Sequence, residues 1–501
     1  MAKTSPSFAV RAFLAAALLA GFYLLAAVVV AALVAIPLME IRYGNSVHPR
    51  IWLFCGIGVW AVINGVRPRL DRFTAPGPRV TEQDQPRLFQ ALRDVAERTG
   101  QAMPAEVYLL PDVNAWVAQR GGLMGFGSRR VMGIGLPLMQ VLSVDELRGV
   151  IAHEFGHYHG GDTALGPWIY RTRAGVERTL HQMRQHSSVL AAPFRAYGTL
   201  FMRITQALSR RAEYAADALA ASIVGPRAMI DGLKTVHAAG HAYEGYWSGE
   251  FAPALENGAR MPMGAGLVRY MSADAVVADV DAMLDHEMRE GRSDPNDSHP
   301  SLRERVAALV SLPASSATVA DDRPSVALLD DLEGCEARLV TSMLKPAFRD
   351  KVSPATWDEA AERVWMPSWR ATMDAHGHRL RGRTPASLAE FAGREADLQV
   401  ALGFLARPDL RTQGTAMMGV PIVGVALMLA LRENGFALRA EPGCEAEAHR
   451  DGVVLRPFVD VKALVEGRMD GEAWVRTWTE AGIADVDLGA AHGAGAVAQP
   501  A

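Results

Sequence analysis

The sequence predicts a mainly helical α+β protein built from three parts. Two uncharged apolar runs near the N-terminus predict a transmembrane helical hairpin within residues 1–70. An amphipathic segment, short strand patterns and a capped helix predict a central domain with a small sheet at 80–312. A stretch rich in Ser, Ala, Pro and Asp at 311–323 predicts the boundary before a small α+β module at 324–490, and residues 491–501 are expected to be a disordered tail.

The overall composition excludes several classes of protein. The chain has 501 residues, of which 50% are hydrophobic and 21% are charged, so it is long enough for about two to four packed units. Its formal net charge of −4 lacks the basic excess of a nucleic-acid binder, and no nucleic-acid partner is expected. Cys55, Cys335 and Cys444 lie far apart, so a disulfide framework is not predicted.

The two apolar runs have lengths that suit membrane spans. Residues 12–39 contain no charge and would form a helix of about 42 Å, longer than a hydrocarbon core of about 30 Å. Residues 51–66 are a shorter uncharged run between Arg50 and Arg67, whose side chains could snorkel to the interface. A second span is favoured here, and a buried soluble helix is the alternative. Membrane lipid is therefore an expected partner.

Basic residues predict the orientation of this hairpin. Lys3 and Arg11 precede the first run, and four arginines follow the second, whereas the connecting loop holds Arg42 and Arg50 against Glu40. Cytoplasmic flanks of membrane helices carry an excess of Lys and Arg. Both ends of the hairpin, and with them the main domain, are expected on the cytoplasmic side of a bacterial-type inner membrane, in a multi-pass protein.

The central segment predicts a small sheet between two helices. Residues 85–100 have the apolar periodicity of an amphipathic helix. Ser143 and Glu146 form a capping-box pattern directly before a second apolar-periodic run, which predicts a helix that begins there. Three strands are predicted between the two helices, at 104–110, 113–117 and 131–136.

The capped helix carries the pattern His153-Glu154-Phe155-Gly156-His157. Residues four apart lie on nearly the same side of a helix, so His153 and His157 can direct their imidazoles at one point. Zinc accepts imidazole nitrogen, and a catalytic zinc site needs three protein ligands plus one open position for water. Glu154 would stand beside the metal, take a proton from the zinc-bound water and pass it to a leaving amine.

A third ligand is expected from a helix further along the chain. Glu213 and Asp217 lie four residues apart, so they share one helix face. We assign Glu213 to the zinc ion, and Asp217 to the second ring N–H of a ligand histidine. The alternative is an exposed acidic helix face paired with Arg210 or Arg211.

These motifs together resemble a known family. The pattern HEFGH, then Asp162, then EYAAD, and then HPSLRER from His299 to Arg305 looks like the HtpX and CAAX-prenyl-protease family of gluzincin metallopeptidases. The resemblance extends over about residues 81–312. It implies a zincin-like domain in which two helices hold one Zn²⁺ per chain through two histidines and a glutamate, and these ligands are His153, His157 and Glu213, with Glu154 as the base.

The resemblance implies roles for further residues. Asp217, Asp162 and Arg305 would support the metal ligands. An edge strand would pair with an extended peptide through main-chain hydrogen bonds, and it comprises Val113, Asn114, Ala115 and Trp116. The best-known members of the family place further membrane spans between the HEFGH and EYAAD helices. Here that interval offers only residues 188–202, interrupted by Pro193 and Arg195, which predicts a more open and less membrane-embedded site.

The remaining histidines divide into one candidate and several ordinary residues. His299 could donate a hydrogen bond to the developing oxyanion, or His-Pro could simply begin a helix that Arg305 ties down, and both interpretations stay open. Surface, packing or supporting roles are predicted for His159, His181, His186, His237 and His241.

The C-terminal module offers structural rather than catalytic signals. Residues 412–431 are uncharged, but their glycines and a proline favour a buried strand or helix over a third span. Residues 446–457 predict a β-hairpin that turns at Asp451-Gly452. Trp474 and Trp478 are expected in the core of the module.

The sequence therefore predicts a membrane-anchored zinc endopeptidase that hydrolyses peptide bonds in extended or unfolded polypeptides, with a role in membrane protein quality control as a hypothesis from the resemblance alone. Two alternatives remain open. The protein could be a membrane scaffold with a vestigial zinc site, or a zinc hydrolase of a non-peptide substrate.

Overall fold

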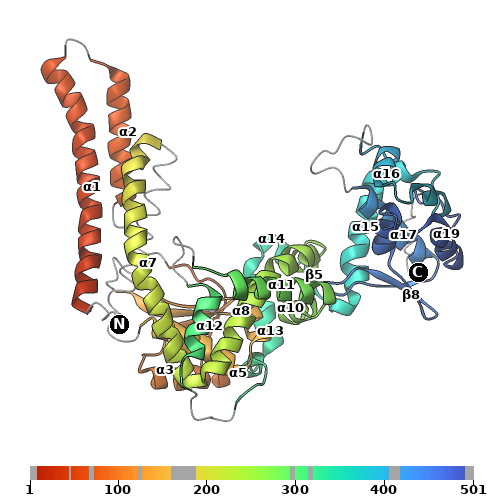
Figure 1. Ribbon diagram of the computed structural model, residues 1–501, viewed down its shortest axis with the longest axis horizontal. Helices are drawn as coiled ribbons and strands as arrows, with labels where there is room; N and C mark the ends of the chain where they lie inside the picture. The colour runs from red at the N-terminus through yellow and green to blue at the C-terminus, as the bar shows by residue number, and fades with distance from the viewer. Residues whose placement is uncertain are drawn as a thin grey trace. The chain divides into compact units, whose positions relative to one another are not determined.

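The computed structural model describes most of the chain as helices, with strands confined to small sheets (Figure 1). It contains two compact units that interleave along the sequence. The first comprises residues 1–240 and 281–342, and the second comprises 241–280 and 343–501. The sequence instead predicts consecutive domains that meet between residues 312 and 324. The residues described are 8–44, 47–66, 73–121, 127–158, 188–293, 300–313, 320–405 and 418–490.

The N-terminal hairpin consists of α1 (Phe8–Tyr43) and α2 (Pro49–Val66). Both helices are long and apolar enough to cross a membrane, and α1 extends several residues beyond the predicted run at each end. Glu40 joins the two helices at their loop: its carboxylate accepts the indole N–H of Trp52 at 2.7 Å and the main-chain N–H of His48 at 2.9 Å. Glu40 therefore links the end of α1 to the loop and to the start of α2.

Helix α7 (Ser188–Val224) runs beside this hairpin and continues without a break through Pro193 (Figure 1). Phe194 is buried against Phe22 of α1 and Val62 of α2. The hydroxyl of Tyr197 donates to the carbonyl of Leu18. The sequence predicts that Pro193 and Arg195 interrupt the apolar run at 188–202, and α7 is not among the candidate membrane spans of the described residues. The helix itself continues, because proline removes only one hydrogen bond near the start of a helix of 37 residues.

Among the described residues, the sheet of the first unit has four strands in the order β1-β2-β4-β3. Strand β4 (Arg129–Gly135) pairs parallel with β2 (Glu106–Leu110) and antiparallel with β3 (Ala115–Arg120), which is therefore an outermost strand. The three predicted strands are confirmed with shifted ends. Strand β1 (Arg79–Val80) was not predicted, because two residues are too short to show a periodicity.

Helices α3 (Pro86–Thr99) and α5 (Val144–Gly156) pack together beside this sheet. The predicted capping box of α5 is confirmed: the Ser143 hydroxyl accepts the Glu146 N–H at 3.2 Å, and the Glu146 carboxylate accepts the Ser143 N–H at 2.7 Å. Both orphan N–H groups are thereby satisfied, which determines where α5 begins. Because the start of α5 is defined, the direction in which His153 and His157 point from the helix axis is defined as well.

The chain re-enters the first unit at Asp281, and residues 320–342 still belong to it. The Val144 N–H donates to the Arg323 carbonyl at 2.9 Å, and the Asp330 N–H donates to the side chain of Gln85 at 2.7 Å. These polar contacts join segments far apart in sequence, so the composition shift at 311–323 could not reveal them. The remaining helices of this part of the chain are α4 (Leu136–Val141), α8 (Pro226–Tyr246), α11 (Asp274–Glu290), α12 (Leu302–Val310), η2 (Ser325–Leu328) and α13 (Leu332–Met343).

The second unit is packed around α17 (Gly419–Glu433), whose residues from Ile422 to Leu431 are all buried. This helix is part of a protein core, as predicted, and residues 412–417 lie outside the described residues. Strands β7 (Ala437–Arg439), β8 (Glu447–Arg450) and β9 (Val453–Leu455) form an antiparallel sheet. Asp451 and Gly452 both have positive φ, at 52° and 82°, which confirms the predicted tight turn.

Trp474 and Trp478 on α19 (Gly471–Glu480) are fully buried in the same core, as predicted. The indole N–H of Trp474 donates to the Pro385 carbonyl at 2.6 Å. The other elements of this unit are η1 (Trp247–Phe251), α9 (Ala252–Glu256), β5 (Ala259–Arg260), α10 (Met263–Met271), α14 (Pro346–Arg349), β6 (Ser353–Pro354), η3 (Trp357–Glu359), η4 (Ala361–Trp365), α15 (Met366–His376), η5 (Gly377–Leu380), η6 (Ala386–Phe391), α16 (Glu395–Ala401) and α18 (Pro457–Val465).

The half-buried carboxyl group of Glu250 makes the stability of the second unit depend on pH. Burial raises the pKa of Glu250 from 4.5 to about 7, and one hydrogen bond from the Gly443 N–H, at 3.1 Å, does not offset the burial. Between pH 4.5 and 7 the folded unit holds a proton that the unfolded chain releases, so its stability should fall as pH rises through this window.

We expect Glu250→Gln to remove that dependence and to stabilise the unit by about 1–3 kcal/mol at pH 8, with little effect at pH 4. Urea unfolding of the detergent-solubilised chain at the two pH values measures the difference. Glu256→Gln, at an exposed position nearby, is the matched control. An equal pH dependence in wild type and Glu250→Gln would contradict the assignment.

Candidate metal centre

Helix α5 presents three potential metal ligands at its C-terminal end. His153 and Glu154 lie in its last turn, and His157 caps the helix with φ and ψ still in the helical region. The imidazole rings of His153 and His157 lie 4.7 Å apart between centroids and are nearly perpendicular, at 85°. Ligand atoms of the two histidines and Glu154 all lie within 4.8 Å of one another, and among the described residues this is the one such group of three.

Helix α7 brings the carboxylate of Glu213 to the same point. Its Oε2 lies 3.4 Å from Nε2 of His153, and its Oε1 lies 3.7 Å from Nε2 of His157. The two helices approach closely because residue 156 is glycine: a Cβ there would lie 2.8 Å from the Cα of Ala216. Gly156 of the motif therefore serves the packing that brings Glu213 to the two imidazoles.

These separations fit a tetrahedral zinc site. Two donors that each lie about 2.0–2.1 Å from one ion at a tetrahedral angle are about 3.4 Å apart. The observed 3.4 and 3.7 Å are close to that value, and the donor set of two imidazoles and one carboxylate is one that zinc accepts. The alternative of an exposed acidic face is wrong, because Glu213 and Asp217 are only 3% and 1% exposed.

Asp217 lies one helical turn beyond Glu213 and orients His153. Its Oδ1 is 2.8 Å from Nδ1 of His153. A carboxylate can only accept a hydrogen bond, so Nδ1 carries the hydrogen and donates it. In the neutral ring this leaves the lone pair of Nε2 directed at the space shared with Glu213 and His157. Asp217 thus lies within hydrogen-bonding distance of one candidate ligand.

Arg305 of α12 holds Asp217 in turn. Its Nε and Nη2 donate to the two carboxylate oxygens of Asp217 at 2.8 and 2.6 Å. Both side chains are buried, and such a two-pronged pair fixes the carboxylate in one plane. Burial would raise the pKa of Asp217, but the hydrogen bonds from Arg305 and His153 outweigh it and hold that pKa below its ordinary value. Asp217 is therefore ionised and able to accept.

The charge balance favours a cation at this centre. Burial would lower the pKa of His153, but its hydrogen bonds to Asp217 and Glu213 raise that pKa to about 9. The two carboxylates of Glu213 and Asp217 outnumber the single guanidinium of Arg305, so this buried space favours one further positive charge, which a proton on His153 can supply. A divalent cation on the imidazole and carboxylate donors would take the place of that proton.

Five of the predicted residues lie outside the described residues: Asp162, His299, His159, His181 and His186. His237 contacts the Leu233 carbonyl through Nδ1 at 2.9 Å, and His241 pairs with Asp279 at 2.8 Å. These two histidines have ordinary surface contacts, as predicted.

The predicted edge strand lies beside the metal helix, since β3 packs against α5. Ala115 and Trp116 begin β3, whereas Val113 and Asn114 precede it. Asn114 nevertheless continues the pairing, because its carbonyl accepts the Gly135 N–H at 2.7 Å. The sequence interpretation missed Tyr158, whose hydroxyl donates to the Val117 carbonyl of β3 at 2.9 Å. A tyrosine directly after the motif carries no pattern that would have indicated this contact.

Neutralising Asp217 should weaken metal binding without removing a ligand. We expect Asp217→Asn to lower zinc affinity about 10–100-fold, because His153 loses the carboxylate that orients it and raises its basicity. Competition with a fluorescent chelator measures this affinity. Asp231→Asn is the matched control, because Asp231 pairs with Arg227 on the exposed surface of α8 and should leave zinc affinity unchanged. Equal affinity in Asp217→Asn and wild type would show that Asp217 does not act through His153.

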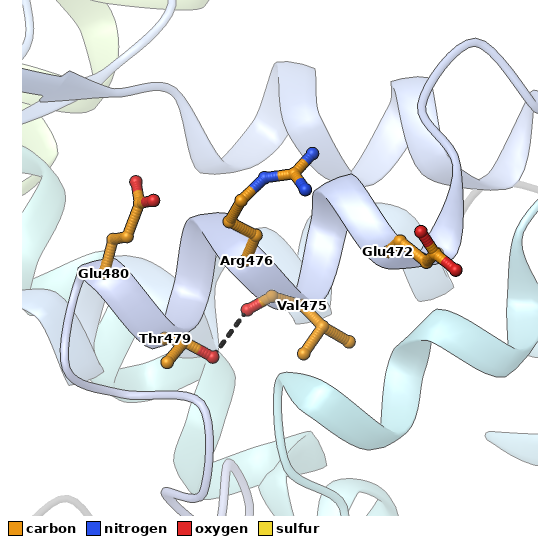
Figure 2. Close-up of a pocket in the computed structure, with 6 residues that line it drawn as sticks. Glu472, Val475, Arg476, Thr479 and Glu480 are labelled. Carbon is orange, nitrogen blue, oxygen red and sulfur yellow. Dashed lines mark hydrogen bonds between the residues drawn. The ribbon is translucent and has the colours of Figure 1, made fainter.

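A shallow depression on the second unit differs in character from this centre. It lies on the outer face of α19 and is lined by Gly471, Glu472, Val475, Arg476, Thr479 and Glu480 (Figure 2). The Thr479 hydroxyl donates to the Val475 carbonyl of its own helix at 2.8 Å, and the charged side chains of Glu472 and Arg476 are exposed (Figure 2). These six residues include no histidine or cysteine and do not converge, so the chemistry belongs to the α5–α7 cluster.

Comparisons with known proteins agree with this centre. The model of peptidase family M48 matches residues 82–312. The protein named "Protease HtpX homolog" from Gemmatimonas aurantiaca is 31% identical over 250 residues, which cover 47% of this chain and 78% of the relative. Proteins of the same name from an Arthrobacter species and from Pseudarthrobacter chlorophenolicus are both 26% identical, and they cover 37% and 38% of this chain and 68% and 70% of the relatives. No solved structure matches the chain.

Proposed function

Because this chain belongs to peptidase family M48 and is a membrane-associated metalloprotease, we propose that it cleaves peptide bonds at one zinc ion held by His153, His157 and Glu213. The observation that carries the proposal is the meeting of two imidazoles from α5 with one carboxylate from α7, at 3.4 and 3.7 Å. These three donors leave the fourth tetrahedral position to water and substrate.

The bound zinc ion would polarise the scissile carbonyl and acidify the attacking water. Glu154 does the proton work. It follows His153 directly in the last turn of α5 and lies within 4.8 Å of the ligand atoms of both histidines. As the water oxygen bonds to the carbonyl carbon, the Glu154 carboxylate takes its proton. Glu154 then delivers that proton to the departing amine nitrogen as the C–N bond breaks.

The chain's other residues keep the donors in place. Asp217 directs the Nε2 atom of His153 inward, and Arg305 prevents the carboxylate of Asp217 from turning toward the metal itself. Only Glu213 of the two acidic residues on this face is then left to bind zinc. His153, Glu213, Asp217 and Arg305 are buried away from bulk water, which strengthens the electrostatic contacts among these four residues.

The substrate proposed is an extended polypeptide that adds to the sheet along β3. This strand is the outermost one of its sheet and packs against the helix that carries His153 and His157. Main-chain pairing recognises any extended peptide with little regard to side chains, which suits unfolded proteins as substrates. A role in the quality control of membrane proteins is consistent with this choice and with the adjoining hairpin.

The hairpin is proposed to cross the inner membrane with the metal centre on the cytoplasmic side. The basic residues beyond both ends of the hairpin favour this orientation. Phe194 and Tyr197 of α7 contact the hairpin, and the same helix carries Glu213. Helix α7 therefore connects the proposed ligand Glu213 directly to a segment that packs on the membrane hairpin. This connection supports cleavage close to the bilayer surface.

The test is hydrolysis by the purified full-length chain in detergent. An unfolded test protein such as reduced, alkylated casein should be cut, 1,10-phenanthroline should abolish the cutting, and added Zn²⁺ should restore it. A small ester substrate serves as the comparison. Turnover of the ester without cleavage of the protein would overturn the peptidase assignment in favour of a non-peptide hydrolase. Turnover that persists with the metal removed would overturn the metal mechanism.

A further inference from the structure

The outer side of β3 is defined by its pairing with β4. In an antiparallel pair, residues alternate between those that exchange hydrogen bonds with the partner and those whose N–H and C=O groups point away. The Gly135 N–H donates to the Asn114 carbonyl, so residues 114, 116 and 118 face β4. Ala115 and Val117 therefore direct their main-chain groups outward, to the side where an added strand would lie.

Tyr158 reaches that outer side from the end of the metal helix. It is the residue directly after His157, and it is 7% exposed. Its hydroxyl donates to the Val117 carbonyl at 2.9 Å, a contact that agrees with the outward direction of this carbonyl. The Arg130 guanidinium lies over the Tyr158 ring, 4.5 Å from its centroid, and fixes the ring beside β3.

The hydroxyl stands where a peptide nitrogen would stand. In a β-ladder the donor nitrogen of an added strand lies about 2.9–3.0 Å from the carbonyl oxygen that accepts its hydrogen. The added backbone runs about 4.8 Å from its neighbour, within the space that the Tyr158 ring fills at this point. A carbonyl has a second lone pair, but the buried ring leaves no room for a backbone to approach it.

We propose that Tyr158 ends the main-chain pairing between β3 and a bound peptide, so that Ala115 pairs with the peptide and the Val117 carbonyl does not. This inference rests on the proposed function, because it concerns a peptide added along β3. Tyr158 is a positioning residue in it. The peptide would leave the sheet beside Tyr158, which directly follows the metal ligand His157 in the sequence. The point of departure therefore sets the register of the peptide relative to the metal.

A methylation scan of a bound peptide tests the proposal. The probe is a peptide of about twelve residues that spans a site at which wild type cuts the unfolded test protein. Each amide nitrogen is methylated in turn, which removes one hydrogen-bond donor, and the Kd is measured for the uncleaving Glu154→Gln chain. In the double variant Glu154→Gln, Tyr158→Ala both the hydroxyl and the ring are removed, so the Val117 carbonyl becomes available. One additional amide should then become sensitive, with a loss of affinity of about 3- to 10-fold on methylation.

Tyr108→Ala in the same Glu154→Gln chain is the matched control. Tyr108 is also a buried tyrosine of this sheet whose hydroxyl makes a hydrogen bond, to Glu106 at 2.8 Å, but it lies on β2, away from the edge. This variant should leave the set of sensitive amides unchanged. Zinc content and the unfolding midpoint report whether each variant is folded.

The outcomes separate the inference from the function on which it rests. Cleavage by wild type, together with identical sets of sensitive amides in the Glu154→Gln chain with and without the Tyr158→Ala substitution, would overturn the role of Tyr158 and leave the peptidase assignment standing. Absence of both cleavage and peptide binding would overturn the two together. A gain of sensitivity in the Tyr108→Ala control would show that loosening of the sheet, not the loss of the Tyr158 side chain, is responsible.

Discussion

Glu154→Gln should lower kcat for peptide cleavage by about 10²–10⁴-fold while zinc content stays at the wild-type level. Glutamine keeps the size of the side chain and its place in the last turn of α5, but it cannot take a proton from the attacking water. The three proposed zinc donors are untouched, so metal binding should not change. Single-turnover cleavage of a labelled unfolded protein, with metal analysis of the same sample, measures both quantities.

Glu244→Gln is the control for that experiment, because Glu244 is exposed on α8. It should retain full activity. Glu154→Gln also separates the peptidase from a membrane scaffold: a cell that depends on the protein should lose the function with this variant if catalysis is the function. Wild-type cleavage by Glu154→Gln would contradict the role of this carboxylate.

Glu213→Ala should lower zinc affinity by more than about 100-fold. Loss of a residue that only orients a ligand costs at most about that much. The substitution removes one of three donors and leaves a void in a buried space that carries Asp217, Arg305 and two imidazoles. Cleavage should be lost along with the metal. Isothermal titration of the metal-free chain with Zn²⁺ gives the affinity directly.

Glu97→Ala on the exposed face of α3 is the control for this second variant, and it should bind zinc as wild type does. Glu213→Asp tests the position of the carboxylate: it keeps the charge but withdraws the oxygens by one methylene, so an intermediate affinity is expected. Wild-type affinity in Glu213→Ala would remove Glu213 from the ligand set.

The metal motif was predictable because its determinants are local. The capping box at Ser143 and Glu146 determines where α5 begins, and the spacing of His153 and His157 then determines their common face. The tight turn at Asp451-Gly452 was predictable for the same reason, since positive φ is a property of the residues themselves. In each case a few neighbouring residues specify the geometry.

Features that depend on long-range packing were not predictable in the same way. The packing of α7 on the hairpin depends on aromatic contacts with α1 and α2, more than 100 residues away in sequence. The contact of Tyr158 with Val117 depends on the register of β3, which only the assembled sheet defines. The packing of residues 320–342 on the first unit involves polar contacts such as that between Asp330 and Gln85, which leave no periodic signature.

Arg305 is an intermediate case. Its place in the sequence motif suggested a supporting role only through the family resemblance, because an arginine on a short amphipathic helix is usually solvated. The structure shows it buried and paired through two nitrogens with Asp217, which in turn contacts His153. Three segments separated by up to 152 residues thus meet in one hydrogen-bonded chain.

X-ray absorption at the zinc K-edge of the purified full-length chain tests the ligand set most directly. The expected spectrum is that of one zinc per chain with two imidazole nitrogens and carboxylate or water oxygens at about 2.0–2.1 Å, and the contribution of the protein oxygen should change in Glu213→Ala. A spectrum with sulfur neighbours, with one imidazole, or with no change in Glu213→Ala would contradict the centre described.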